Sequence, residues 1–198
     1  MAGRPREFDR DQALHKALAT FWQYGYEGTS MALLVSALGI ASARIYAAFG
    51  SKEQLFREVV ALYLAEQGGF AERVISRGLP VCQAVEQILL DAIATYTAAD
   101  GPRGCLAVSS TASGGPDITG VLDWMSELRR QRTQSIIDLL RQAHGRGELQ
   151  ADADPEALGD LFATLLHGIA IQARDGIDAP RLQAMIKPAL SALRAARA

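Results

Sequence analysis

The sequence is poor in the residues from which metal and catalytic sites are usually built. It has three histidines and two cysteines, and Cys82 and Cys105 stand outside any CxxC spacing. This excludes a disulfide framework and a zinc site of the usual ligand spacing. HExxH, a glycine-rich phosphate loop, clustered carboxylates and a nucleophile–base pairing are also missing, so we expect no enzyme, no metal and no cofactor.

Long apolar runs are scarce as well. The longest, residues 161–171, is interrupted by Thr164 and His167 and is too short to span a bilayer. The segment from Met1 to Arg6 lacks the apolar core of a signal peptide. We therefore expect a cytoplasmic protein with no membrane partner.

What the chain has in quantity is alanine and leucine, with few β-branched runs and 49% hydrophobic residues. This composition favours an all-α fold, and 198 residues suffice for a sizeable core. Charge is unevenly spread: residues 1–57 carry seven basic and five acidic residues, whereas the remainder carries thirteen and seventeen. The asymmetry fits a small nucleic-acid-reading head on an acidic body.

Residues 28–55 carry the clearest motif. Thr29 and Ser30 are N-cap residue types before an apolar run, and Gly39 can supply the positive φ that ends a helix. Ser42 can then cap a second short helix, residues 43–49. Two short helices joined by a tight glycine turn predict a helix-turn-helix, whose second helix enters the DNA major groove.

The second helix has one apolar side, formed by Ile45 and Phe49 at i, i+4 spacing. Arg44 on the other side can pair with a phosphate or a guanine edge, and the Tyr46 hydroxyl can reach a phosphate. The residues predicted to face DNA from this helix are Ser42, Ala43, Arg44, Tyr46 and Ala47, with Thr29 and Ser30 from the preceding helix start.

Two further features support a DNA contact. Ser51 and Gln54 form a capping box for the next helix, and Lys52 in its first turn opposes the helix dipole, which is favourable only if a phosphate lies at the same terminus. Arg4 and Arg6 precede a first helix that should run from its N-cap Asp9 to about Tyr24. This basic arm either enters the minor groove or is a solvated terminus.

This segment resembles the DNA-binding motif of the TetR family of transcriptional regulators. The resemblance covers about the first sixty residues, in which Ala41 and Ala43 replace more polar positions. It implies a DNA-binding regulator, more commonly a repressor, with a small-molecule pocket in the body that controls DNA affinity. The matching residues are Phe21, Gly25, Tyr26, Thr29, Ser30, Gly39, Ile40, Tyr46, Phe49, Lys52, Glu53, Leu55 and Phe56.

The predicted domains are a DNA-binding head, residues 1–55, and an effector-binding and dimerisation body, residues 56–198. A helix from Ser51 to about Phe70 joins them, and five helical segments follow. The expected segments are a helix starting at Pro80, a short segment 104–112 ended by residues 113–116, a long helix 117–144, a helix capped by Asp154, and a last helix 178–196. Pro188 should kink or split the last helix after Lys187.

The helix after Asp154 is apolar on nearly all sides, so we expect one side to face a partner chain. Paired about a two-fold axis with the last helix, it would form a four-helix interface. A homodimer would read a palindromic DNA operator with half-sites about 34–36 Å apart or a multiple of that. The predicted interface residues are Leu158, Leu161, Phe162, Leu165, Ile169, Leu182, Met185, Ile186 and Leu190.

The resemblance implies a small apolar or aromatic effector, although each candidate could equally be a core residue. The candidate pocket residues are Tyr96, Cys105, Trp124, Met125, Phe162 and His167. Alternatively, Cys105 is a redox or electrophile sensor, because it follows Arg103 and Gly104 at a helix start, where the thiol pKa can fall. A further alternative, an all-helical carrier or enzyme without DNA binding, has no motif in its favour.

Overall fold

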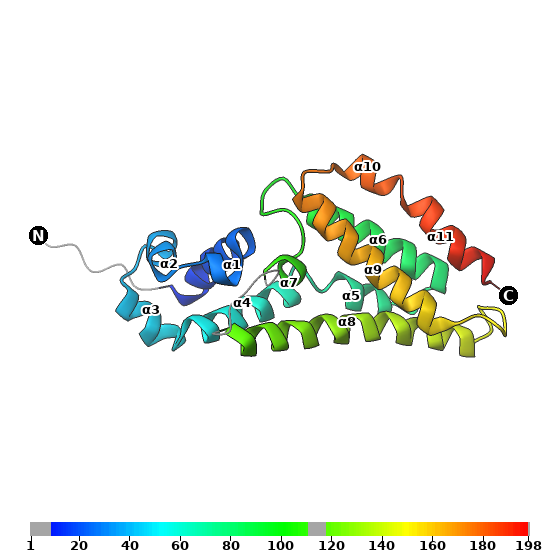
Figure 1. Cartoon of the computed structure of the whole chain (residues 1–198), viewed down its shortest axis with the longest axis horizontal. Coiled ribbons are helices and arrows are strands. Elements are labelled where there is room, and N and C mark those ends of the chain that lie inside the picture. The colour runs from blue at the N-terminus through cyan, green and yellow to red at the C-terminus, as the bar shows by residue number, and fades with distance from the viewer. Residues whose placement is uncertain (1–8, 111–117, 198) are drawn as a thin grey trace, which may run out of the picture.

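The computed structural model describes residues 9–110 and 118–197, and in these ranges the predicted all-α fold is confirmed. At one end of the molecule, α1 (Arg10–Gly28), α2 (Met31–Leu38) and α3 (Ser42–Phe49) form the head (Figure 1). Helix α4 (Lys52–Ala65) runs from the head into the body and ends five residues earlier than predicted. The remaining helices are α5 (Phe70–Ile75), α6 (Val81–Tyr96), α7 (Leu106–Ser109), α8 (Thr119–Gly145), α9 (Pro155–Arg174), α10 (Ala179–Gln183) and α11 (Ile186–Ala195).

Most of the helix starts that the sequence predicted have a side-chain cap in the structure. The Ser30 hydroxyl accepts from the Leu33 amide at 3.1 Å, and Ser51 accepts from Gln54 at 3.0 Å. Asp9 and Asp154 cap α1 and α9 in the same way. The predicted cap at Ser42 is wrong: Ser42 is already the first helical residue, and Ala41 before it offers no side-chain hydrogen bond.

Helix α1 is interrupted at Gly25, whose φ of 73° and ψ of 175° are open to glycine alone among the residues. The break turns the amide of Tyr26 toward the body, where it donates to the carbonyl of Ser110 at 2.9 Å. A Cβ on residue 25 would lie 3.2 Å from that carbonyl oxygen. The predicted end of the first helix at Gly25 is therefore a change of direction, after which helical turns continue to Gly28.

Helix α8 runs along the length of the body, from the end of α4 nearest the body to the far end, where it packs against α9 (Figure 1). Its 27 residues correspond to about 40 Å. Near its start, the Trp124 ring meets the Phe56 ring edge-on at 6.1 Å and lies 4.4 Å from the Arg57 guanidinium. The long helix thus packs against the helix that leaves the head.

The last helix is split, but at a different place from the one predicted. It breaks at residues 184–185, so Pro188 stands in the first turn of α11. Amides in a first helical turn have no intrahelical partner, so proline is accommodated there without a lost hydrogen bond. The predicted end of the short segment at residues 113–116 lies outside the described residues.

The rotation of α9 also differs from the prediction. Phe162 and Ile169 are buried against the rest of the same chain, because α8 and α6 cover that side of α9. Five predicted interface residues are buried within their own chain: Phe162, Ile169, Leu182, Ile186 and Leu190. Leu158, Leu161, Leu165 and Met185 keep exposed surface.

No single helix in the described ranges is long and apolar enough to cross a membrane. Helices α2 and α3 pass that test of length and composition only when taken together, and they are bent by 92° relative to each other. That angle is typical of a helix-turn-helix.

Candidate functional site

Helix α3 has one buried and one exposed side, as predicted. Ile45 and Phe49 are 2% and 4% exposed and hold the helix on the head core. Ser42, Ala43, Arg44, Tyr46 and Ala47 are all exposed, and Tyr46 keeps 47% of its surface accessible. The helix therefore presents small residues, one cation and one phenol to solvent.

The orientation of α3 is fixed from both ends. At its start, Gly39 takes φ 72° and its amide donates to the Val35 carbonyl at 3.0 Å, which closes the turn after α2. At its end, the Arg10 guanidinium lies 4.5 Å from the Phe49 ring centre and binds Glu58 of α4 at 2.8 Å. Arg10 therefore ties α1, α3 and α4 together behind the exposed side.

Three predicted DNA-contact residues outside α3 are less freely exposed or have another structural role. Thr29 is completely buried, and its hydroxyl donates to the Gly25 carbonyl at 2.6 Å, so the predicted side-chain contact is wrong. Ser30 is exposed but is also the cap of α2. The Lys52 ammonium lies 4.5 Å from the Tyr26 ring centre, and burial lowers its pKa. Arg4 and Arg6 lie outside the described residues.

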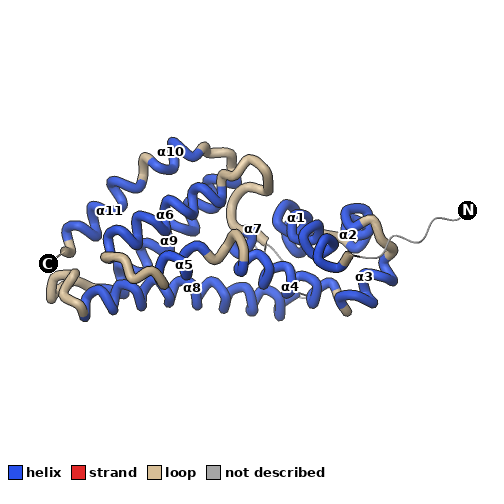
Figure 2. The backbone as a smooth tube through the Cα atoms, turned by 180° about the vertical axis from the view of Figure 1, so that it is seen from behind, coloured by secondary structure: helices blue, strands red, loops and turns tan. Residues whose placement is uncertain are grey.

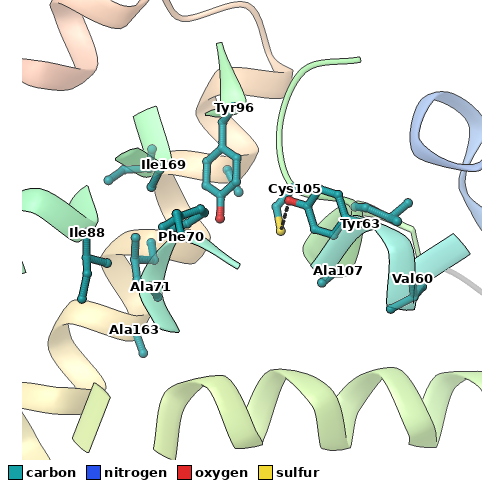
Figure 3. Packing of buried hydrophobic residues seen from close by; sticks show 14 of the residues in the cluster. Val60, Tyr63, Phe70, Ala71, Ile88, Tyr96, Cys105, Ala107, Ala163 and Ile169 are labelled. Carbon is teal, nitrogen blue, oxygen red and sulfur yellow. Dashed lines mark hydrogen bonds between the residues drawn. The ribbon is translucent and has the colours of Figure 1, made fainter. Parts of the chain in front are cut away.

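A polar cluster lies inside the body, between the head and α9. The Cys105 thiol is completely buried; the Tyr63 hydroxyl donates to it at 3.3 Å and Arg132 Nη1 at 3.7 Å. Figure 3 shows Tyr63 and Tyr96 approaching this sulfur from two different helices, α4 and α6. We call Cys105, Tyr63, Tyr96 and Arg132 the thiol cluster.

The thiol cluster lowers the pKa of Cys105. Burial on its own raises the pKa of Cys105, but Arg132 and the two phenols together outweigh it, and the net pKa lies below that of an ordinary cysteine. Burial, with the charge on Cys105, raises the pKa of both Tyr63 and Tyr96 well above the usual value. Both phenols therefore remain protonated and act as hydrogen-bond donors.

Two of the predicted effector residues line one cavity next to this cluster. Tyr96 and His167 enclose it with Arg132, and its volume is about 20 Å³. Cys105 belongs to the thiol cluster, whereas Met125 and Phe162 are packed in the core and Trp124 contacts the head-side helix α4. In the described ranges, no group of three or more His, Cys, Asp or Glu side chains could hold a metal ion.

The sequence analysis missed Tyr63 and Arg132. Arg132 carried a usable signal, because it stands at helical spacing between Met125, Leu128 and Ile136 on the buried stripe of α8. A charged residue in that register needs a buried partner. Tyr63 carried no such signal, since a tyrosine on an apolar helix face is ordinary core.

The segment around Cys105 also holds the head. Directly before Cys105, the Gly104 carbonyl accepts from the Trp22 indole at 3.2 Å. A few residues after it, the Ser110 carbonyl accepts from the Tyr26 amide. Arg174 of α9 adds hydrogen bonds to the carbonyls of Trp22 and Gln23 at 3.3 and 3.0 Å. Figure 2 shows the loop that follows α6 passing between α1 and the body on its way to α7.

An exposed helix of a helix-turn-helix, joined through buried contacts to a larger helical body, defines a two-domain DNA-binding regulator. Residues 13–59 match the sequence profile of bacterial regulatory proteins of the tetR family. The chain belongs to the TetR family of transcriptional regulators.

Several relatives match over nearly the whole chain. The HTH-type transcriptional repressor ComR of Escherichia coli (strain K12) is 33% identical over 91% of this chain and 86% of its own. BdcR, a repressor of the same organism, is 27% identical over 88% and 83%. A solved structure of the TetR family regulator CifR, a cysteine variant in complex with 26-bp double-strand operator DNA, is 40% identical with a TM-score of 0.90 and covers 96% of this chain and 99% of its own.

Proposed function

We propose that this protein is a repressor that binds a palindromic DNA operator as a homodimer and releases it when the body receives a chemical signal. The observation that carries the proposal is the exposed side of α3. Its small residues allow close approach to base edges, and Arg44 and Tyr46 are the polar side chains placed to bind phosphate or guanine.

The relatives support this function. ComR and BdcR are named repressors. The two CifR structures, with TM-scores of 0.90, are both complexes with double-strand operator DNA. An operator-binding head of this kind is useful only in pairs, because one head reads too few base pairs for specificity.

Helix α9 offers an exposed apolar surface to which a second copy of the chain can bind. Leu161 and Ile171 are large apolar side chains that are 40% and 42% exposed. Between them lie Thr164, Leu165 and the exposed Gly168, at which an added Cβ would meet nothing within 4 Å. An apolar stripe with a glycine at its centre lets a second helix approach closely, and a two-fold axis would pair the stripe with itself.

The signal has two candidate forms. The first is a small apolar or aromatic effector near Tyr96 and His167, for which the cavity of about 20 Å³ would have to open. The second is covalent modification of Cys105, and the thiol cluster favours it, because three hydrogen-bonding groups around the sulfur stabilise the reactive thiolate. Either would act through the contacts of Gly104 and Ser110 with α1, with a coupling free energy of about 1–3 kcal/mol.

The test starts with selection of bound DNA from a random library by the full-length protein, and with light scattering at micromolar concentration. We expect an enriched palindrome and a dimer. Tyr46→Phe should then weaken operator binding roughly a hundredfold, since two heads each lose a hydroxyl–phosphate hydrogen bond of about 1.5 kcal/mol.

Tyr24→Phe is the matched control. Tyr24 is 50% exposed, close to the 47% of Tyr46, but it lies on α1 next to Gln23, which the body contacts through Arg174. It should leave the affinity unchanged. A monomer, random DNA without enrichment, or equal effects of the two substitutions would refute the proposed function.

A further inference from the structure

We propose that a groove between α1 and the body binds small aromatic carboxylates, and that such an anion fastens the head to the body and strengthens operator binding. This groove is separate from the thiol cluster and from the cavity beside it. Only the effect on the operator rests on the function proposed above. We call the site the junction groove; its walls are Ala19, Trp22 and Gln23 of α1, residues 101–103 of the loop after α6, and Arg174 of α9.

The junction groove has the size of a ligand site. Its volume is about 500 Å³, which lies within the range of about 300–1,000 Å³ that is typical of small-molecule pockets. Three separate parts of the chain form it, and Figure 2 shows that the loop after α6 lies beside α1. A molecule bound in this groove therefore touches the head and the body at the same time.

The charge of the junction groove selects an anion. In residues 9–110 and 118–197, neither Arg103 nor Arg174 forms an ion pair with a carboxylate. A guanidinium presents its donors in a planar fork that matches the two oxygens of a carboxylate. Two such forks in one groove favour a carboxylate over a cation or a neutral molecule.

Both arginines keep donors beyond their present hydrogen bonds. Arg103 Nη2 donates to the Ile177 carbonyl at 2.6 Å, whereas the Arg103 Nε is buried and meets no acceptor in the part of the chain that the structure describes. A buried N–H without an acceptor is unfavourable, so an oxygen brought to this guanidinium is stabilising. Arg174 spends two of its five N–H groups on the carbonyls of Trp22 and Gln23. A carboxylate can therefore bind both arginines without displacing these contacts.

The apolar part of the wall selects an aromatic ring. Trp22 and Pro102 line the junction groove together. The Trp22 indole nitrogen is engaged by the Gly104 carbonyl at 3.2 Å, so the part of this largely buried ring that reaches the wall is carbon surface. Aromatic rings pack well against indole and against the flat face of a guanidinium. An aromatic acid can thus place its ring at Trp22 and its carboxylate at the arginines.

The two arginines stand at the two places where the body holds α1. The break in α1 turns the Tyr26 amide away from the Trp22 carbonyl, to which an unbroken helix would direct it, and Arg174 donates to that carbonyl instead. On the other side of the groove, Arg103 directly precedes Gly104, whose carbonyl accepts from the Trp22 indole. A carboxylate shared by the two arginines therefore braces both contacts at once.

This bracing has a definite sign. In the function proposed above, the signal acts by loosening the contacts between α1 and the body, so a ligand that tightens them has the opposite effect. The coupling is reciprocal: the anion raises the affinity for the operator, and the operator raises the affinity for the anion. We expect a gain of about fivefold, the lower end of typical couplings, because both arginines keep exposed surface and are screened by solvent.

The binding test needs no DNA. Full-length protein labelled with ¹⁵N is titrated with phenylacetate, with its neutral counterpart 2-phenylethanol, and with inorganic phosphate, an anion without a ring. The sequence has two tryptophans, so the indole region holds two signals, assigned through Trp124→Phe. Phenylacetate should shift the Trp22 signal with a Kd of about 1 mM and leave the Trp124 signal in place. The other two probes should bind at least about tenfold more weakly.

Two pairs of variants test the groove. Arg103→Gln should weaken phenylacetate binding at least about tenfold, because it removes hydrogen bonds to a charged group. Arg181→Gln is the matched control, since Arg181 is an exposed arginine of α10 outside the groove, and it should bind as the wild type does. If Arg103→Gln unfolds, Gly101→Glu replaces it: a Cβ there meets nothing within 4 Å, and the tethered carboxylate should block phenylacetate, whereas Gly101→Gln should not.

Operator affinity is then measured by fluorescence anisotropy at constant ionic strength, with and without about 10 mM phenylacetate, ten times the expected Kd. We expect about fivefold tighter binding in the wild type and in Arg181→Gln, and no change in Arg103→Gln. A Trp22 shift in a protein that selects no operator refutes the proposed function and upholds the anion site. An unmoved Trp22 signal, equal binding of 2-phenylethanol, or equal losses in the two arginine variants refutes the site. Unchanged or weaker operator binding by the occupied protein refutes the bracing.

Discussion

Replacing Gly104 by alanine tests whether the segment before Cys105 positions the head. Gly104 has φ +84°, and a Cβ there would lie 2.8 Å from the Ala170 carbonyl oxygen. Gly78 is a matched control: its φ is +63°, and a Cβ would meet nothing within 4 Å. Both substitutions strain the backbone, but only the one at position 104 also creates a clash.

The magnitudes follow from these two contributions. Left-handed backbone costs a non-glycine residue about 1–2 kcal/mol, so Gly78→Ala should lower the free energy of unfolding by that amount. Overpacking against a fixed carbonyl adds about 1–3 kcal/mol at position 104. For a chain of this length about 2–4 °C in Tm corresponds to 1 kcal/mol, so Gly104→Ala should melt about 2–12 °C below Gly78→Ala.

Circular dichroism melts of both variants at the same dimer concentration give the comparison, and operator affinity is measured beside them. Because the Gly104 carbonyl accepts from Trp22, the alanine variant should also bind the operator more weakly, whereas Gly78→Ala should not. Equal melting temperatures would mean that the close approach to Ala170 is absent. A large drop in Tm with unchanged operator affinity would mean that this segment does not position the head.

Three further predictions concern other parts of the chain. In urea titrations, Gly159→Ala should lower the free energy of unfolding by about 1–3 kcal/mol, because the added Cβ would lie 2.9 Å from the Ile137 Cα. Gly120→Ala places its Cβ in open space on α8 and should raise the free energy of unfolding by up to about 1 kcal/mol. Burial, followed by the charges of two arginines of α8, lowers the pKa of His167 in the folded protein, so this histidine takes up a proton more readily in the unfolded chain. The contribution of His167 to stability should therefore be complete above about pH 6.5 and decrease as the pH falls below that value. His167→Gln should flatten this pH dependence in melts at pH 5 and 7.5. If Arg44 binds a phosphate in each of the two heads, Arg44→Gln should reduce the slope of log affinity against log salt concentration by about 1.8, since each lost phosphate contact accounts for about 0.9. An unchanged slope together with a relaxed base preference would instead assign Arg44 to a guanine.

Local rules were enough to predict the head. Its helix ends depend on Ser30, Gly39 and Ser51, whose capping and turn geometry is set within a few residues of chain. The division of α3 into buried and exposed sides followed from the spacing of Ile45 and Phe49. Thr29 was misassigned because a hydroxyl at a helix junction can bind either DNA or its own backbone, and the break at Gly25 supplies the backbone acceptor.

The body was predicted less well because its features depend on contacts between distant segments. An apolar helix such as α9 can bury either side, and only the positions of α6 and α8 decide that Phe162 faces inward and Leu161 outward. The thiol cluster unites residues 63, 96, 105 and 132 from four parts of the chain. The sequence analysis named Cys105, through its place after Arg103 and Gly104, and Tyr96 as a candidate pocket residue, but neither Tyr63 nor Arg132.

The contact between Tyr26 and Ser110 is made by main-chain atoms on both sides. At the two residues that form it, only proline at position 26, which has no amide hydrogen, removes the hydrogen bond. Substitutions over the surface of the body therefore leave this hydrogen bond in place, while the exposed Ser42, Ala43 and Ala47 of α3 can change without disturbing the core of the head. Changes on the outer side of α3 can therefore alter which DNA sequence is read and leave the attachment of the head to the body as it is.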